Sequence, residues 1–284
     1  MPRNKVEWKV GNEIWRLGER TLVCGVIEAW PAPGPGETTC EDPDRAFVRA
    51  NELLDAGADF IEIAAERYAP GVALLGEAEE LRRLVPILKR LRGKLAAPLA
   101  VQTWKPAVAE KAIEYGAQII RDPSGLTLDQ DLGRVVVKQN AAFVLQHMRE
   151  TPEKWARLGA WKNPATLVLA ELTAALNRAN RLGIDRARLA ADPGFGMGKR
   201  KETNTELLAA LEDFQRLRIP VMVSPDRQAF DADVRVDPSA ATAAAATALC
   251  VSRGAHILRT SDPASLRPAA LVADGLLRAA AARA

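Results

Sequence analysis

The residues best suited to chemistry in this sequence are polar and charged side chains that directly follow short apolar runs. If these runs are the strands of a parallel barrel, their ends meet around one mouth, where the following loops build the site. We therefore expect a charged pocket that suits a small polar heterocycle with an anionic or phosphorylated group. In chain order the residues are Glu28, Glu62, Glu66, Gln102, Arg121, Asp122, His147, Arg149, Asp192, Asp226, Arg227, Arg259 and Asp262.

The stretch Asp-Pro-Gly-Phe-Gly-Met-Gly-Lys at positions 192–199 is the most informative of these. Asp192 ends a candidate strand, and its carboxylate could accept two hydrogen bonds from an amino-heterocycle. The glycines let the backbone turn tightly and approach a ligand, and Lys199 could bind an anion. Taken alone the pattern is weak evidence, because it fits neither the phosphate-binding GxxxxGK[ST] loop nor the dinucleotide fingerprint.

Eight candidate strands alternate with eight helical stretches from residue 21 onward. This alternation predicts an α/β fold, a parallel (β/α)8 TIM barrel. A doubly wound sheet would show the same alternation, but it usually has six strands. The candidate strands are residues 21–27, 59–64, 98–102, 118–121, 142–146, 189–191, 220–223 and 257–259. The stretches with helical spacing are residues 44–56, 77–92, 106–115, 128–138, 164–182, 204–217, 240–253 and 263–282.

We expect one domain over residues 1–284, with a short N-terminal hairpin in residues 1–20 and the barrel in residues 21–284. Gly11 and Gly18 lie between apolar residues and indicate a hairpin that caps the barrel floor. Gly-Ala pairs at 57–58, 116–117 and 254–255 each end a helix and lead into a strand. Glycine suits the position after a helix because it adopts a left-handed backbone without steric cost.

The composition excludes several classes of protein. Of 284 residues 48% are hydrophobic and 26% charged, which excludes disorder, collagen and a disulfide scaffold. The net charge is +3, and residues of both signs are interspersed along the chain, so we expect no nucleic-acid partner. No apolar run is long enough to span a membrane, and the first residues contain no apolar secretory segment. Cys24, Cys40 and Cys250 lack CxxC spacing and predict reduced thiols in a cytoplasmic protein. His147 and His256 are too few for a histidine-rich zinc site.

Several stretches of the sequence, taken in order, carry a resemblance to a known family: residues 17–27, 57–63, 70–71, 105–109, 120–125, 147–149, 192–199, 204 and 254–259. They resemble the dihydropteroate synthase family, the pterin-binding TIM barrel of folate biosynthesis. The resemblance implies a site for 6-hydroxymethyl-dihydropterin diphosphate, from which Mg²⁺ helps the diphosphate leave while p-aminobenzoate attacks the methylene carbon. It also implies a homodimer, with the apolar helix 268–282 as a candidate surface. The similarity covers residues 11–282.

The resemblance assigns a pterin pocket whose residues differ in part from the family's. Asp192 and Met148 are kept, and Met197 replaces an aromatic residue beside the ring. Gln102 and Arg121 stand where the family has Asp and Asn, and Gln228 stands where it has Lys. Gln102 exchanges two acceptors for one acceptor and one donor, and Arg121 adds a positive charge that favours an anion.

The anion and metal positions of the family differ as well. Arg259 matches an anion-binding arginine, whereas Ser261 replaces the histidine that accompanies it. Glu28 replaces an asparagine near the metal and the diphosphate, and its carboxylate could hold Mg²⁺. The arginine of the second loop is replaced by Ala69, and Arg67 could take over its role.

The first hypothesis is therefore a homologue of dihydropteroate synthase with a degenerate site, which binds a pterin-like or anionic small molecule without ordinary synthase activity. Alternatives are a working synthase with a diverged site, a non-catalytic dimeric partner of a folate enzyme, and a related methyltetrahydrofolate-dependent methyltransferase barrel. We expect His147 to pack at a strand end. Glu62 and Glu66 would form a carboxylate pair only if their strand stayed regular to residue 66.

Overall fold

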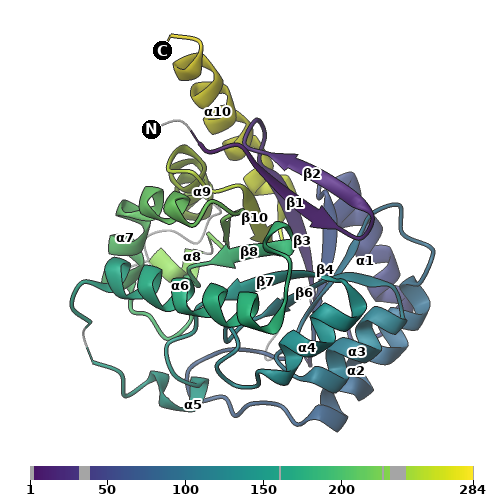
Figure 1. Cartoon of the computed structure of the whole chain (residues 1–284). Coiled ribbons are helices and arrows are strands. Elements are labelled where there is room, and N and C mark those ends of the chain that lie inside the picture. The colour runs from purple at the N-terminus through teal and green to yellow at the C-terminus, as the bar shows by residue number, and fades with distance from the viewer. Residues whose placement is uncertain (1–2, 32–38, 160, 226, 231–240, 284) are drawn as a thin grey trace.

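The computed structural model describes residues 3–31, 39–159, 161–225, 227–230 and 241–283, and its main feature is an eight-stranded parallel sheet (Figure 1). The strands are hydrogen-bonded in the order β8-β7-β6-β5-β4-β3-β10-β9. A parallel bridge between Ala191 and Val221 brings the two outer strands together, and the Ala191 amide donates to the Pro220 carbonyl at 2.9 Å. The predicted TIM barrel is thus confirmed. The strands are β3 (Leu22–Glu28), β4 (Phe60–Ala64), β5 (Leu99–Gln102), β6 (Ala117–Asp122), β7 (Ala142–Gln146), β8 (Leu189–Asp192), β9 (Met222–Val223) and β10 (Ile257–Thr260).

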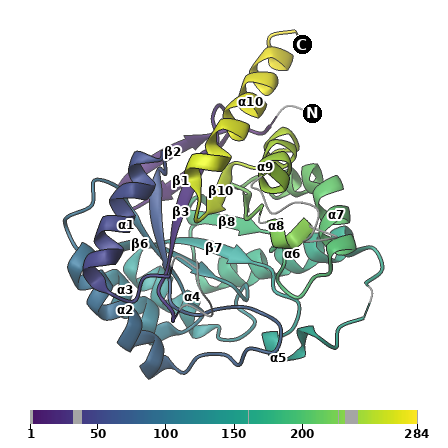
Figure 2. The ribbon, with the colours of Figure 1, turned by 180° about the vertical axis from the view of Figure 1, so that it is seen from behind.

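The helices surround the sheet, as the two opposite views show (Figures 1 and 2). They are α1 (Pro43–Asp55), α2 (Glu77–Leu91), α3 (Pro106–Glu114), α4 (Asp131–Gln139), α5 (Pro152–Trp155), α6 (Pro164–Leu182), α7 (Lys201–Ala209), α8 (Arg227–Phe230), α9 (Ala241–Ser252) and α10 (Pro263–Ala281). Predicted and observed bounds agree within a few residues for most elements. The Gly-Ala pairs also behave as predicted, with φ of +96° at Gly57, +102° at Gly116 and +103° at Gly254.

The prediction of one helix over residues 204–217 is wrong. The α-helix α7 begins earlier, at Lys201, and ends at Ala209, and a 3₁₀ helix, η2 (Leu211–Leu217), follows it. Leu211, Phe214 and Leu217 are all buried. These three residues recur every third position, which is the period of a 3₁₀ helix, so its tighter winding places all of them on one face.

Alternate residues of the strands fill the inside of the barrel. Phe60, Ile119, Met222 and Ile257 belong to this interior cluster, whereas the opposite strand faces pack against the helices in a second cluster. Two residues beyond an interior position, the next side chain again points inward. This alternation carries polar side chains from the ends of the strands into the mouth of the barrel.

The predicted N-terminal hairpin is present as an antiparallel pair, β1 (Val6–Val10) and β2 (Glu13–Leu17). Its Trp8 is fully buried in the interior cluster, and its ring centroid lies 6.3 Å from that of Phe60 at the start of β4. The indole nitrogen of Trp8 donates to the Arg188 carbonyl at 2.9 Å, next to the start of β8. The hairpin therefore closes the barrel floor and leaves the opposite end for the site.

The buried His256, which precedes β10, should make the fold sensitive to acid. Its Nδ1 accepts a hydrogen bond from the Val221 amide at 3.2 Å, and its Nε2 lies 2.9 Å from the Asn4 carbonyl, which fits a neutral ring. Burial lowers the pKa of His256 from 6.5 to about 4. An unfolded chain binds the proton at higher pH, so stability is full above pH 6.5 and is lost as the pH falls toward 4.

We expect this loss to be on the order of 3 kcal/mol for His256. Urea unfolding at pH 7 and at pH 4.5 would measure it for the wild type and for His256→Gln, which has no titrating ring. The variant should be less stable at pH 7 and should lose less on acidification. Equal losses in the two proteins would assign the acid sensitivity to other groups.

Candidate functional site

Five side chains from five strands form one chain of polar contacts across the mouth of the barrel. Arg259 donates through Nε to Glu62 Oε1 at 2.7 Å and through Nη2 to Gln102 Oε1 at 3.2 Å. Arg121 donates through Nη1 to the same Gln102 oxygen at 2.5 Å and through Nη2 to Asp192 Oδ2 at 2.8 Å. We call Glu62, Arg259, Gln102, Arg121 and Asp192 the mouth network.

The charges of the mouth network cancel, because its two arginines face two carboxylates. Four of the five residues are buried, and only Arg259 is partly exposed, with 17% of its side chain accessible. Burial alone would lower the pKa of Arg259, but the contact with Glu62 outweighs it and raises the pKa above its ordinary value. Arg259 therefore stays a cation at the surface of the network, where an incoming anion could meet it.

Two polar atoms of the mouth network have no partner within the part of the chain that the structure describes. These are Arg121 Nε and Glu62 Oε2, which lie 4.0 Å apart. Both are buried, and the distance between them is too long for a hydrogen bond. The network thus keeps unused hydrogen-bonding capacity at its centre.

The glycine-rich loop after β8 is fastened by Asp192 and Lys199. Asp192 Oδ1 accepts from the Gly194 amide at 2.7 Å. The ammonium of Lys199 donates to three main-chain carbonyls, those of His147, Gly194 and Met197, at 3.1, 2.7 and 3.2 Å. Burial lowers the pKa of Lys199 to about 7. Lys199 is buried and committed to the backbone, so it holds the loop and does not present itself to an anion as the sequence suggested.

His147 lies at the end of β7, as expected of a residue that packs at a strand end. Its amide donates to the Asp192 carbonyl at 2.9 Å, and its Nε2 lies 2.8 Å from Glu171 Oε2 on α6. Burial, and then the nearby Lys199, lower the pKa of His147 to about 4 despite the contact with Glu171. The ring is therefore neutral near pH 7 and connects β7 to α6.

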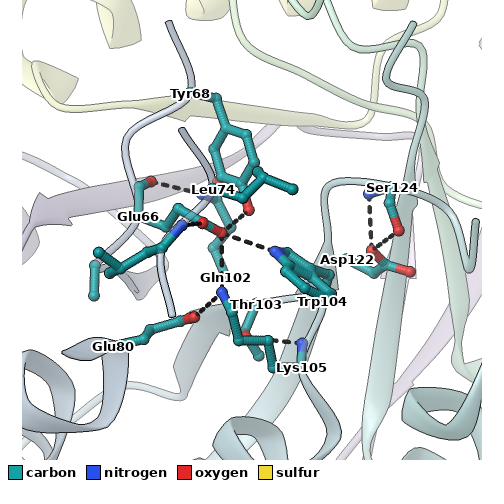
Figure 3. A network of polar contacts seen from close by, with 12 residues as sticks. Glu66, Tyr68, Leu74, Glu80, Gln102, Thr103, Trp104, Lys105, Asp122 and Ser124 are labelled. Carbon is teal, nitrogen blue, oxygen red and sulfur yellow. Dashed lines mark hydrogen bonds and ion pairs between the residues drawn. The ribbon is translucent and has the colours of Figure 1, made fainter. Parts of the chain in front are cut away.

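Glu66, on the loop that follows β4, belongs to a second network (Figure 3). Its carboxylate accepts from the Tyr68 hydroxyl, from the Leu75 amide and, at 2.9 Å, from the Trp104 indole nitrogen. Lys105 Nζ lies 3.3 Å from Glu66 and 2.5 Å from Glu80. These contacts tie the loop after β4 to the loop after β5.

Glu62 and Glu66 therefore do not form a carboxylate pair. The strand β4 ends at Ala64, so its alternation does not continue to residue 66. Glu62 points into the barrel toward Arg259, whereas Glu66 binds loop groups and Lys105. Burial raises the pKa of Glu80, and burial together with Glu66 raises the pKa of Tyr68.

The structure brings five of the predicted residues into the mouth network and leaves the others outside it. The five are Glu62, Gln102, Arg121, Asp192 and Arg259. Met148 and Met197 are half-buried on the loops above β7 and β8, and Glu28 is half-buried at the end of β3. Arg67 and Ser261 are exposed, and no contact among the described residues connects them to the network. Gln228 lies on α8, its side chain is outside the described part, and Asp226 is outside it entirely.

Two further mouth residues were missed from the sequence. Gln146 ends β7 directly beside Asp192 in the strand register, and Ser224 follows β9. Gln146 Oε1 and Ser224 Oγ are buried and have no hydrogen-bond partner among the described residues. The available signal was strand alternation: each lies two residues beyond an interior position, Val144 or Met222.

In the described ranges, no group of three or more His, Cys, Asp or Glu side chains is arranged to hold a metal ion. Magnesium, however, is commonly held by one or two carboxylates together with the phosphate oxygens of a substrate. Glu28, which shares the mouth with Arg259, is the residue that would supply such a carboxylate. No helix in the described part is long and apolar enough to cross a membrane.

Comparisons with known proteins show that this chain is similar to the members of one family. A family model described as pterin binding enzyme matches residues 35–261. Dihydropteroate synthase of Clostridium beijerinckii is 32% identical over 222 residues, which cover 78% of this chain and 80% of the relative. Dihydropteroate synthase of Bacillus subtilis is 29% identical over 262 residues, or 91% of this chain and 90% of the relative.

Solved structures agree with the sequence matches. Yersinia pestis dihydropteroate synthase in complex with a sulfonamide drug superposes with a TM-score of 0.88 at 26% identity, covering 96% of this chain and 100% of the other. Xanthomonas albilineans dihydropteroate synthase with 4-aminobenzoic acid gives a TM-score of 0.82 at 29% identity, covering 96% and 98%. The barrel and its connections are therefore shared over nearly the whole chain.

Proposed function

Since this chain belongs to the dihydropteroate synthase family of pterin-binding enzymes, we propose that it binds a pterin-like or anionic small molecule at the barrel mouth without the ordinary synthase reaction. One observation carries this proposal. Asp192, the retained acceptor of the pocket, is ion-paired with Arg121 of the same chain at 2.8 Å. A pterin would have to displace a buried guanidinium before it could use that carboxylate, and breaking a buried ion pair is costly.

The mouth keeps a cation for a negatively charged ligand. Arg259 is the partly exposed member of the mouth network, and its charge is secured by Glu62. Arginine binds carboxylates and phosphates through two parallel donors, so it suits an anionic group better than a neutral one. If the ligand carries phosphate, Glu28 would hold a Mg²⁺ ion together with the phosphate oxygens.

A working synthase is the second candidate, favoured by the retained scaffold around Asp192. Asn204 Oδ1 accepts from the Gly196 amide at 3.1 Å, and its Nδ2 donates to the Ala229 carbonyl at 2.8 Å. The glycine-rich loop is thereby held on both sides, as a functional pocket requires. In such an enzyme the amine of p-aminobenzoate would attack the methylene carbon of the pterin and release diphosphate.

Isothermal titration with 6-hydroxymethyl-dihydropterin diphosphate, with and without Mg²⁺, followed by a turnover assay with p-aminobenzoate, separates the two candidates. We expect binding without turnover, and a loss of affinity of about tenfold or more in Arg259→Gln. Arg16→Gln is the matched control, because Arg16 is 87% exposed on the floor hairpin. Turnover would establish the synthase, and no binding at all would overturn both candidates.

We also propose that two copies of the chain associate through α9 and α10. Four large apolar side chains are exposed there: Leu249 on α9 and Leu271, Val272 and Leu276 on α10. Val272 is the most exposed of them at 74%, and it lies one helical turn from Leu276. Exposed apolar patches of this kind mark association surfaces.

Light scattering after gel filtration should give a dimer mass for the wild type and a monomer mass for Val272→Asp. Leu167→Asp on α6 is the control, since Leu167 is also exposed but lies away from the patch. A monomeric wild type would refute this assembly, and so would a dimer that Val272→Asp leaves intact. A reducing, cytoplasmic location is proposed too, supported by the three buried free cysteines.

A further inference from the structure

We propose that Arg121 itself occupies the place on Asp192 where an amino-heterocycle or guanidine would bind, so that the mouth selects its ligand by anionic groups. The inference rests on the proposed function for the existence of a ligand at the mouth. Of the two ligand classes named there, it selects the anionic one and excludes a pterin held through its amino edge.

The contacts of Arg121 reproduce those of a bound heterocycle edge. Its two terminal nitrogens lie in one plane and donate to two acceptors on different strands, Asp192 Oδ2 and Gln102 Oε1. A 2-amino-4-oxo-pyrimidine ring presents the same pattern, with two neighbouring N–H donors on one edge. The other carboxylate oxygen of Asp192 accepts from the Gly194 amide. Both oxygens of Asp192 are therefore engaged by the chain itself.

Burial and charge keep the guanidinium in this position. Arg121 is 2% exposed, and Asp192 and Glu62 lie on two sides of it. With Arg121 the mouth network has no net charge, and without it the network has one negative charge in excess. Lys199 compensates Asp192 only in part, because its ammonium is committed to the loop carbonyls. The space that the guanidinium leaves would therefore attract a cation or a strong donor.

The substitution Arg121→Ala should turn the mouth into a receptor for the edge that Arg121 mimics. Titration calorimetry with guanidinium chloride and with isocytosine, a 2-amino-4-oxo-pyrimidine, is the direct test. We expect the variant to bind each probe about tenfold more tightly, or more, than the wild type does. Adding Asp192→Asn should remove the gain, because the carboxylate is the acceptor. Arg16→Ala, on the floor hairpin, leaves the mouth network intact and should produce no gain.

If Arg121→Ala folds too poorly for calorimetric titration, the shift of its melting temperature on adding the probe tests the same binding. Low millimolar guanidinium should raise the melting temperature of the variant and leave that of the wild type unchanged or lower, with sodium chloride as the salt control. No gain by either method would overturn the inference, as would a gain that survives Asp192→Asn. The proposed function fails separately, if the wild type binds neither inorganic pyrophosphate nor 6-hydroxymethyl-dihydropterin diphosphate.

Discussion

Replacing Asp274 by alanine should lower the free energy of unfolding by about 3–5 kcal/mol, since it leaves a buried arginine without its partner. Asp274 lies on α10 and is 2% exposed. Its carboxylate accepts from Arg3 Nη2 at 2.9 Å, from the Thr21 amide at 2.8 Å and from the Thr21 hydroxyl at 2.8 Å. The residue thus joins the last helix to the start of the chain and to the segment that leads into β3.

The matched control for Asp274 is Asp262, the N-cap of the same helix. Asp262 Oδ1 accepts from the Ser265 amide at 3.2 Å, and Asp262 is exposed. Asp262→Ala should therefore lower the free energy of unfolding by only about 1 kcal/mol, which is usual for the loss of a helix N-cap. Urea unfolding at pH 7 measures both variants. Comparable small losses would show that the contacts between Asp274 and Arg3 contribute little net stability.

Replacing Gly194 by alanine should be the most damaging single-methyl change in the glycine-rich loop. The added Cβ would lie 2.0 Å from the His147 carbonyl oxygen, and Gly194 has φ of +68°. Backbone strain and overpacking together should cost about 2–5 kcal/mol. Relief of the clash would move the Gly194 amide away from Asp192 and the Gly194 carbonyl away from Lys199.

Gly196→Ala is the control for Gly194→Ala, because it differs only in its surroundings. Gly196 has φ of +76°, and a Cβ there would have no heavy atom within 4 Å. Gly196→Ala should lower the free energy of unfolding only through left-handed backbone strain, by about 1–2 kcal/mol. Differential scanning calorimetry of both variants compares them directly. Equal losses of stability in the two variants would mean that the loop shifts readily to accommodate the added methyl group, so that the close approach to His147 does not constrain residue 194.

The fold was largely predictable from the sequence, because it depends on periodicity. Strand bounds such as Ala142–Gln146 and helix bounds such as Pro164–Leu182 follow from apolar spacing and agree residue for residue with the structure. Residues at strand ends were likewise identified as candidates. Their position along a strand is a local property, which a single sequence contains.

Side-chain partners were much less predictable, because barrel closure decides them. Arg121 and Asp192 are 71 positions apart, and Arg259 and Glu62 are 197 apart. Nothing local indicates that each arginine has a carboxylate within reach. Lys199 illustrates the same limit: its type suggested an anion site, but its surroundings give it three carbonyls instead.

The way Lys199 is anchored has an evolutionary consequence. All three of its acceptors are main-chain carbonyls, which every residue type supplies. The Met197 carbonyl would remain in place if the half-buried Met197 side chain were exchanged for another. Selection can therefore vary the side chain that the loop presents at position 197 while the loop keeps its path. A barrel built in this way can acquire a new ligand preference by point substitution, without a change in backbone.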